Sequence, residues 1–182
     1  MQEYIDIWTE HGVPTNKSCL KEEAHLKGLF HPTVHIWFYT KSGCILLQQR
    51  SRHKDTFPSF WDVSVAGHVL SGESILNAAI REVKEEIGLK ILERNLLQID
   101  VRKNVNIHPN GINDYEFQHI FLCELLVDIN DLKIQDEEVD DITLISLDKL
   151  KFYIENRKET FKLVPADYTY YAFIIEQVNK VI

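Results

Sequence analysis

A tight glycine turn at residues 67–73 leads into an amphipathic helix that ends near Gly88, and this unit constrains the chain more than any other stretch. Ser71 is the expected N-cap, and Glu73 is expected in the first turn, where the helix dipole favours negative charge. Gly88 stands where a left-handed cap should end the helix. Apolar residues at helical spacing form a single stripe along it: Leu76, Ala79, Ile80, Val83 and Ile87.

The opposite face of this helix is acidic. Glu82, Glu85 and Glu86 stand at positions i, i+3 and i+4, so their carboxylates converge on one patch. Like charges this close repel one another unless a cation lies between them. Mg²⁺ and Mn²⁺ prefer such oxygen ligands and commonly share them with substrate phosphates. The alternative is a solvated charged face that the interleaved Arg81 and Lys84 soften.

The complete pattern resembles the Nudix box. Gly67 is followed after five residues by Glu73, and after seven more by the run at residues 81–89. The signature positions are occupied throughout: Gly67, Glu73, Arg81, Glu82, Glu85, Glu86 and Gly88. This resemblance implies an α/β Nudix hydrolase, an α/β/α sandwich with a mixed central sheet. Such enzymes hydrolyse a diphosphate that is linked to some other group, X.

The same resemblance implies roles for the residues of the box. Glu85 and Glu86 are the main ligands of a Mg²⁺ or Mn²⁺ cofactor, and Glu82 is a further ligand or the base that activates water. The backbone carbonyl of Ala66 is expected to join them on the metal. Arg81 is expected to orient the glutamates, so the expected catalytic set is Glu82, Glu85 and Arg81.

Further residues complete the expected site. Three residues of the box are expected to hold the loop and the helix together: Gly67, Glu73 and Gly88. Many similar hydrolases add a carboxylate from outside the box, and Glu138, in the acidic stretch before residues 142–147, is the candidate. Glu116 is its rival, and a solvated acidic loop is the alternative reading of the stretch.

A second and less specific resemblance covers more of the chain. Residues 29–31, 46–50 and 60–61, together with the Gly-His pair at 67–68, are similar to the isopentenyl-diphosphate isomerase branch of the Nudix superfamily. Those isomerases need a cysteine directly before the Gly-His pair, where this chain has Ala66. The expectation is therefore a hydrolase on an isomerase-like frame. The alternatives are an isomerase that acts on prenyl diphosphates and a catalytically silent module that senses a ligand.

The isomerase resemblance also implies a second metal site. The residues that the resemblance implies are His25, His31, His68 and Glu116, and Asp114 is a further candidate because of its place beside Glu116. Asp114 and Glu116 lie two residues apart on one expected strand and therefore share a face. Three imidazoles with one or two carboxylates suit Zn²⁺, Mn²⁺ or Fe²⁺ better than Mg²⁺. In the alternative, His68 is a hydrogen-bonded loop residue and His25 is exposed.

A basic cluster at residues 50–54 stands out because the chain carries a net charge of −8. Its members Arg50, Arg52 and Lys54 are candidates to bind substrate phosphates, although an ordinary solvated loop fits the pattern equally well. The acidic balance argues against a nucleic-acid partner. The expected ligand, as the Nudix resemblance implies, is a small diphosphate. No apolar run reaches the length of a membrane span. Oligomeric state stays open, with a homodimer as one candidate because dimers are common among similar proteins.

The remaining pattern predicts a single domain over residues 1–182, with an N-terminal hairpin extension at about 1–30 and a C-terminal helix at about 167–180. Residues 33–39 and 44–50 predict a hairpin, and long strands are expected at 96–106 and 115–127. A strand at 142–147 and a helix at 148–156 should follow, and this alternation favours an α/β fold. The three widely spaced cysteines fit free thiols in a reducing cytoplasm: Cys19, Cys44 and Cys123.

Overall fold

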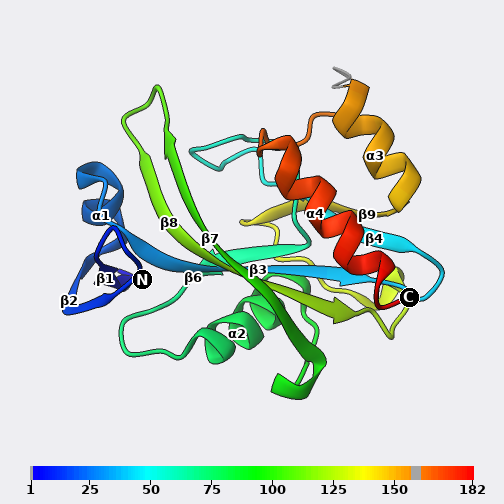
Figure 1. Cartoon of the computed structure of the whole chain (residues 1–182), viewed down its shortest axis with the longest axis horizontal. Helices are drawn as coiled ribbons and strands as arrows, with labels where there is room; N and C mark the ends of the chain where they lie inside the picture. The colour runs from blue at the N-terminus through cyan, green and yellow to red at the C-terminus, as the bar shows by residue number, and fades with distance from the viewer. Residues whose placement is uncertain (1, 157–160) are drawn as a thin grey trace.

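A seven-stranded mixed sheet organises the computed structural model, which describes residues 2–156 and 161–182 (Figure 1). Its main path runs β5-β4-β3-β8-β7, while β6 also pairs with β3 and β9 with β4. Strands β3 and β8 are parallel, and the other pairs are antiparallel. The strands are β3 (His31–Tyr39), β4 (Cys44–Arg50), β5 (Trp61–Asp62), β6 (Val65–His68), β7 (Leu96–Ile107), β8 (Asn113–Glu124) and β9 (Val139–Ser146).

Helices cover both faces of the sheet. Helix α2 (Ile75–Ile87) packs on one face, and α3 (Leu147–Asn156) and α4 (Tyr168–Asn179) cover the other (Figure 1). Successive residues of β3 alternate between the two cores, since Phe38 belongs to the α2 side and Trp37 to the α4 side. This arrangement confirms the predicted α/β/α sandwich with a mixed sheet.

A small N-terminal unit lies beside the start of β3 (Figure 1). It consists of an antiparallel hairpin of β1 (Tyr4–Trp8) and β2 (Pro14–Leu20), followed by α1 (Lys21–Lys27). Gly28 ends α1 in the left-handed conformation, with φ of 61°, and the chain then turns directly into β3. Short 3-10 turns at Glu93–Asn95 and Ile129–Asp131 complete the regular structure.

The start of α2 differs from the prediction. Ser74 is the N-cap, and its hydroxyl accepts a hydrogen bond from the amide of Asn77 at 3.2 Å. The expectation for Ser71 was wrong because its hydroxyl instead donates to Asp6 of β1 at 2.6 Å. Glu73 therefore lies before the helix rather than in its first turn. The other end agrees with the prediction, since Gly88 caps α2 with φ of 69°.

The predicted hairpin of residues 33–39 and 44–50 is correct at its turn only. Strands β3 and β4 both form, but they pair at the single position Tyr39–Ile45. Strand β6 takes the same edge of β3 from Thr33 to Ile36, so β4 diverges and pairs along its length with β9. The divergence leaves room between β3 and β4 for β6, which leads into the glycine turn at residues 67–73.

Gly88→Ala tests how tightly the end of α2 is packed. An added Cβ would lie 2.8 Å from the Cβ of Lys133 and 3.0 Å from its carbonyl oxygen. Gly72→Ala is the matched control, because its φ of 77° is similar and no atom lies within 4 Å. We expect the control to lower the free energy of unfolding by about 1 kcal/mol and Gly88→Ala by about 2–4 kcal/mol. Urea denaturation measures both, and equal losses would contradict the packing argument.

Candidate metal and diphosphate site

A cavity of about 610 Å³ opens where β3, β6, β8 and α2 meet the segment before α4. The carboxylates of α2 lie on one side of it, and the start of β3 forms part of its floor. Most of the residues singled out in the sequence line this cavity. Among them are Glu82, Glu85, Glu86, Ala66, Gly67, Arg81, His25, His68, Asp114, Glu116, Arg50, Lys54 and Glu138.

Arg81 links the turn before α2 to the acidic face of the helix. Its Nε and Nη2 atoms donate to the two carboxylate oxygens of Glu73 at 3.0 and 2.9 Å. Its Nη1 atom donates to Glu82 at 2.7 Å and to Glu85 at 3.0 Å. Nη2 also donates to the carbonyl of His68 at 2.8 Å. One guanidinium therefore holds three carboxylates and the end of β6 in a fixed arrangement.

Gly67 is required by the close approach of Glu82. A Cβ atom added to Gly67 would overlap the carboxyl group of Glu82. On the neighbouring residue, the amide of Ala66 lies 3.4 Å from the Glu86 carboxylate. The glycine thus lets two glutamates of α2 come against the backbone of β6.

Glu86 is a buried carboxylate on the acidic face of α2. Only 4% of the residue is exposed, and burial, with the nearby charge of Glu82, raises the pKa of Glu86 to about 8. Burial also raises the pKa of Glu82, although Arg81 opposes that effect. Oxygen donors that are concentrated, desolvated and only partly neutralised fit a hard divalent cation.

The three basic residues of the 50–54 loop occupy different environments. Lys54 lines the cavity and forms an ion pair with Glu138, so Glu138 faces the same cavity through this contact. Arg50 also lines it but is braced by Asp62 at 3.0 Å. Arg52 does not line the cavity, because its side chain is 68% exposed and pairs with Asp140 at 3.2 Å. The structure therefore places Arg50 and Lys54 at the cavity and leaves Arg52 outside it.

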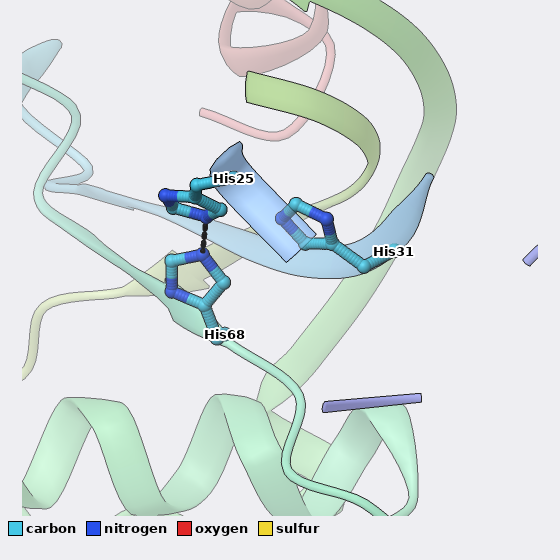
Figure 2. Close-up of side chains that lie close together, drawn as sticks. All are labelled: His25, His31 and His68. Carbon is cyan, nitrogen blue, oxygen red and sulfur yellow. Dashed lines mark hydrogen bonds between the residues drawn. The ribbon is translucent and has the colours of Figure 1, made fainter. Parts of the chain in front are cut away.

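Three histidines converge beside the glutamates. His25 comes from α1, His31 from β3 and His68 from β6 (Figure 2). Each offers a ligand atom, and these atoms lie within 4.8 Å of one another. The Nε2 atoms of His25 and His68 are 3.0 Å apart. The cluster combines segments that are distant in the sequence.

The tautomer of His31 prepares it to be a ligand. Its Nδ1 lies 2.8 Å from the carbonyl oxygen of Leu29, which can only accept, so Nδ1 carries the proton. The lone pair of Nε2 is then free, and this buried atom has no hydrogen-bond partner in the described residues. Burial lowers the pKa values of all three histidines, that of His25 to about 4, and metal ligands must likewise be neutral.

Both predicted carboxylates adjoin the histidine cluster. Asp114 lies 3.7 Å from Nδ1 of His25 and 2.7 Å from Nε2 of His108. Glu116 is the register neighbour of His31 across β3 and β8. The alternative placements of the histidines were wrong. His68 lies in strand β6, and the side chain of His25 is only 16% exposed.

Several cavity residues escaped the sequence reasoning, among them Lys21, His35, Gln118 and Tyr170. For His35 a signal was present, because residues 31, 33 and 35 alternate on one strand and therefore share a face. Gln118 follows Glu116 at the same spacing. Lys21 and Tyr170 reach the cavity from the helices α1 and α4, and no local sequence pattern predicts that these two side chains line it.

The comparisons with known proteins agree on one family. The sequence model of the NUDIX domain matches residues 29–166. An uncharacterized Nudix hydrolase of Clostridium acetobutylicum is 34% identical over 159 residues, which cover 86% of this chain and 76% of the relative. An isopentenyl-diphosphate Delta-isomerase of Escherichia coli is 31% identical over 140 residues, which cover 76% of this chain and 74% of the relative.

A solved structure supports the fold as well. The crystal structure of a Deinococcus radiodurans protein matches with a TM-score of 0.67 at 19% identity, covering 96% of this chain and 98% of that one. The chain belongs to the Nudix family of enzymes, which hydrolyse a diphosphate bond in derivatives of nucleoside diphosphates and generally use divalent metal ions. Of the helices described, none is both long and apolar enough to cross a membrane.

Gly67→Ala tests the contact between β6 and α2. The added methyl group must displace the Glu82 carboxylate, and a shift of about 1 Å at such a site can lower kcat by about a hundredfold. The free energy of unfolding should change little, because the flexible end of a side chain can move aside. Steady-state kinetics and thermal unfolding measure the two effects. Gly111→Ala, which meets no atom within 4 Å, should keep wild-type kcat, and a Gly67→Ala enzyme of normal activity would refute the argument.

Proposed function

We propose that this chain is a Mg²⁺- or Mn²⁺-dependent pyrophosphohydrolase that acts on a small organic diphosphate. The observation that carries the proposal is the arrangement of Glu82 and Glu85 around Arg81, with the buried Glu86 beside Glu82, at the wall of a cavity that also holds Lys54. Glu85, Glu86 and the carbonyl of Ala66 would hold the cation. When bound, it would neutralise phosphate charge and favour attack at phosphorus.

The protein residues have separate tasks in this proposal. Arg81 holds the glutamates in position, and Glu73 in turn holds Arg81. Glu82 accepts a proton from the attacking water, a task that suits a carboxylate whose pKa is raised by burial. Lys54 binds a phosphate oxygen, which requires it to leave Glu138. Glu138 is then free to act as a further ligand at the same cavity.

Glu85→Gln tests the role of the acidic face. Replacing a ligand carboxylate by an amide of the same shape should lower kcat by about 10²–10⁴-fold without loss of folding. The measurement is phosphate or pyrophosphate release from nucleotides, nucleotide sugars and prenyl diphosphates with Mg²⁺ or Mn²⁺. Glu93→Gln, on an exposed 3-10 turn, is the matched control and should stay at wild-type activity. Full activity of Glu85→Gln would exclude the proposal.

Isomerisation of a prenyl diphosphate is the second candidate because of the similarity to isopentenyl-diphosphate isomerase. Ala66 occupies the position where those enzymes need a cysteine. In the described part of the chain, none of the free thiols of Cys19, Cys44 and Cys123 lines the cavity. Conversion of isopentenyl diphosphate to its allylic isomer would nevertheless favour the isomerase over the hydrolase. A silent ligand sensor is less favoured, because every glutamate of the box is present.

We assign a second metal site to His25, His31 and His68, with Asp114 and Glu116 at its border. The supporting observations are the clustering of the three ligand atoms and the unpartnered Nε2 of His31. Imidazole donors favour Zn²⁺, Mn²⁺ or Fe²⁺. Asp114 contacts Nδ1 of His25, whereas Nε2 of that ring faces His68. The carboxylate would therefore orient the ring, as carboxylates commonly do for metal-bound histidine.

Elemental analysis of purified protein tests this second site. We expect about one equivalent of transition metal in the wild type and a loss of most of it in a His31→Ala/Glu116→Gln double variant. His11→Ala is the control, since its side chain is 81% exposed and is not one of the clustered histidines. Equal metal content in the double variant and the control would refute the proposed second metal site.

The setting of the enzyme completes the proposal. Its partner is a small molecule rather than a nucleic-acid polymer, in keeping with the net charge of −8. Three free cysteines suit a reducing, cytoplasmic location. A homodimer stays a prediction, which size-exclusion chromatography with light scattering can test.

A further inference from the structure

Strand β7 forms an open edge of the main sheet. It is the last strand of the path β5-β4-β3-β8-β7 and runs for 12 residues (Figure 1). In the part of the chain that the structure describes, β8 is the one strand that pairs with it. A long unpaired edge is a template for another strand, and soluble proteins often interrupt such edges with proline. Strand β7 contains no proline, so its outer edge can accept a partner strand.

Large hydrophobic side chains are exposed along this strand. They are Leu97 at 51%, Val101 at 44%, Val105 at 44% and Ile107 at 69%. Lys103 stands among them, but its ammonium group donates to the carbonyl of Glu10 at 2.9 Å and lies 4.6 Å from the centre of the Phe30 ring. The lysine is therefore held against its own subunit. Exposed apolar side chains on an unpaired edge are typical of an interaction surface.

The charges of β7 select one way in which two copies of the strand can pair. In an antiparallel pair of identical strands, facing side chains share a face of the sheet only when the two-fold axis passes through a residue. The bulge before Asp100 leaves residues 100–107 in regular pairing with β8. Within this segment, an axis at Arg102 or Lys103 would place like charges opposite each other. An axis at Val101 places Asp100 opposite Arg102 of the second copy, and no other axis in the segment pairs opposite charges.

Both charged groups are accessible at this edge. Asp100 accepts from Nε of Arg102 at 2.8 Å and from the amide of Val101 at 2.9 Å, and the two charged side chains are 35% and 26% exposed. With the axis at Val101, each carboxylate would lie between two guanidinium groups, one from each copy. Such complementarity mainly fixes the register of an interface. The burial of the two Val101 side chains against each other adds apolar contact at the axis.

We infer that this protein forms a two-fold symmetric dimer in which β7 pairs with β7 of a second copy, antiparallel and with the axis at Val101. The two sheets would then continue into one another. No residue of the acidic face takes part, so the interface is independent of the proposed reaction. Because Arg102, Asn104 and Asn106 line the cavity, the strand of the second copy would run along the border of each site.

Sedimentation equilibrium of the full chain tests the interface. Wild type should dimerise with a Kd below about 100 μM, and a protein that stays monomeric at this concentration would overturn the inference. Val101→Lys brings two ammonium groups together at the axis and should raise the Kd at least about tenfold. Leu126→Lys is the matched control, because Leu126 is 73% exposed and lies outside β7. A dimer that Val101→Lys weakens no more than the control does would also overturn the inference.

A charge exchange tests the register. Asp100→Arg places guanidinium groups opposite each other and should raise the Kd by about tenfold. The double variant Asp100→Arg/Arg102→Asp restores opposite charges in the same register, so its Kd should return to within about threefold of wild type. A double variant as weak as Asp100→Arg would refute the axis at Val101.

Hydrogen–deuterium exchange of the wild type needs no variant. The amides of β7 should exchange more slowly in dimeric than in monomeric samples, whereas those of β2 in the N-terminal hairpin should exchange equally in both. Equal exchange of β7 in the two samples would place any dimer interface elsewhere and overturn the inference.

Discussion

The five hydrogen bonds of Arg81 connect the structural parts on which the proposed chemistry depends. Carboxylates as close as Glu82 and Glu85 repel one another, and a buried charge without a partner costs several kcal/mol. A single guanidinium offsets this cost, since it is planar and can bind two acids at fixed angles. Because it also holds Glu73 and the carbonyl of His68, the position of α2 relative to β6 is fixed at the same point. The hydrogen bonds that stabilise the carboxylates are therefore the same ones that fix α2 relative to β6.

Strand β3 shows how one stretch of sequence serves two layers. Alternate side chains enter the core beneath α2 and the space beneath α4, so each face has its own composition. The α2 side is apolar along the strand, as at Val34 and Ile36. The other side changes along its length from His31, through Thr33 and His35, to the apolar Trp37. Polar residues are placed where the cavity lies, and hydrophobic packing resumes where α4 covers the sheet.

The sequence was informative where one element alone carries the information. The turn and helix at residues 67–89 have fixed spacing, so the acidic face and the Gly88 cap could be predicted. The start of that helix was misplaced by three residues, because the partner of Ser71 is Asp6, which is far away in the chain. The contact between His35 and Tyr170 could not be predicted either, because the two residues are 135 positions apart and only the folded sheet brings them together.

The contact between Tyr170 and His35 has a consequence for the order in which the enzyme matures. Every ligand proposed for the cations lies before residue 139, whereas Tyr170 lies in the last helix of the chain. During synthesis from the N-terminus, the acidic helix and the three histidines leave the ribosome well before α4 does. A nascent chain could therefore assemble its metal-binding part early. The end of the cavity beside α4 would be completed last, when α4 docks and Tyr170 contacts His35.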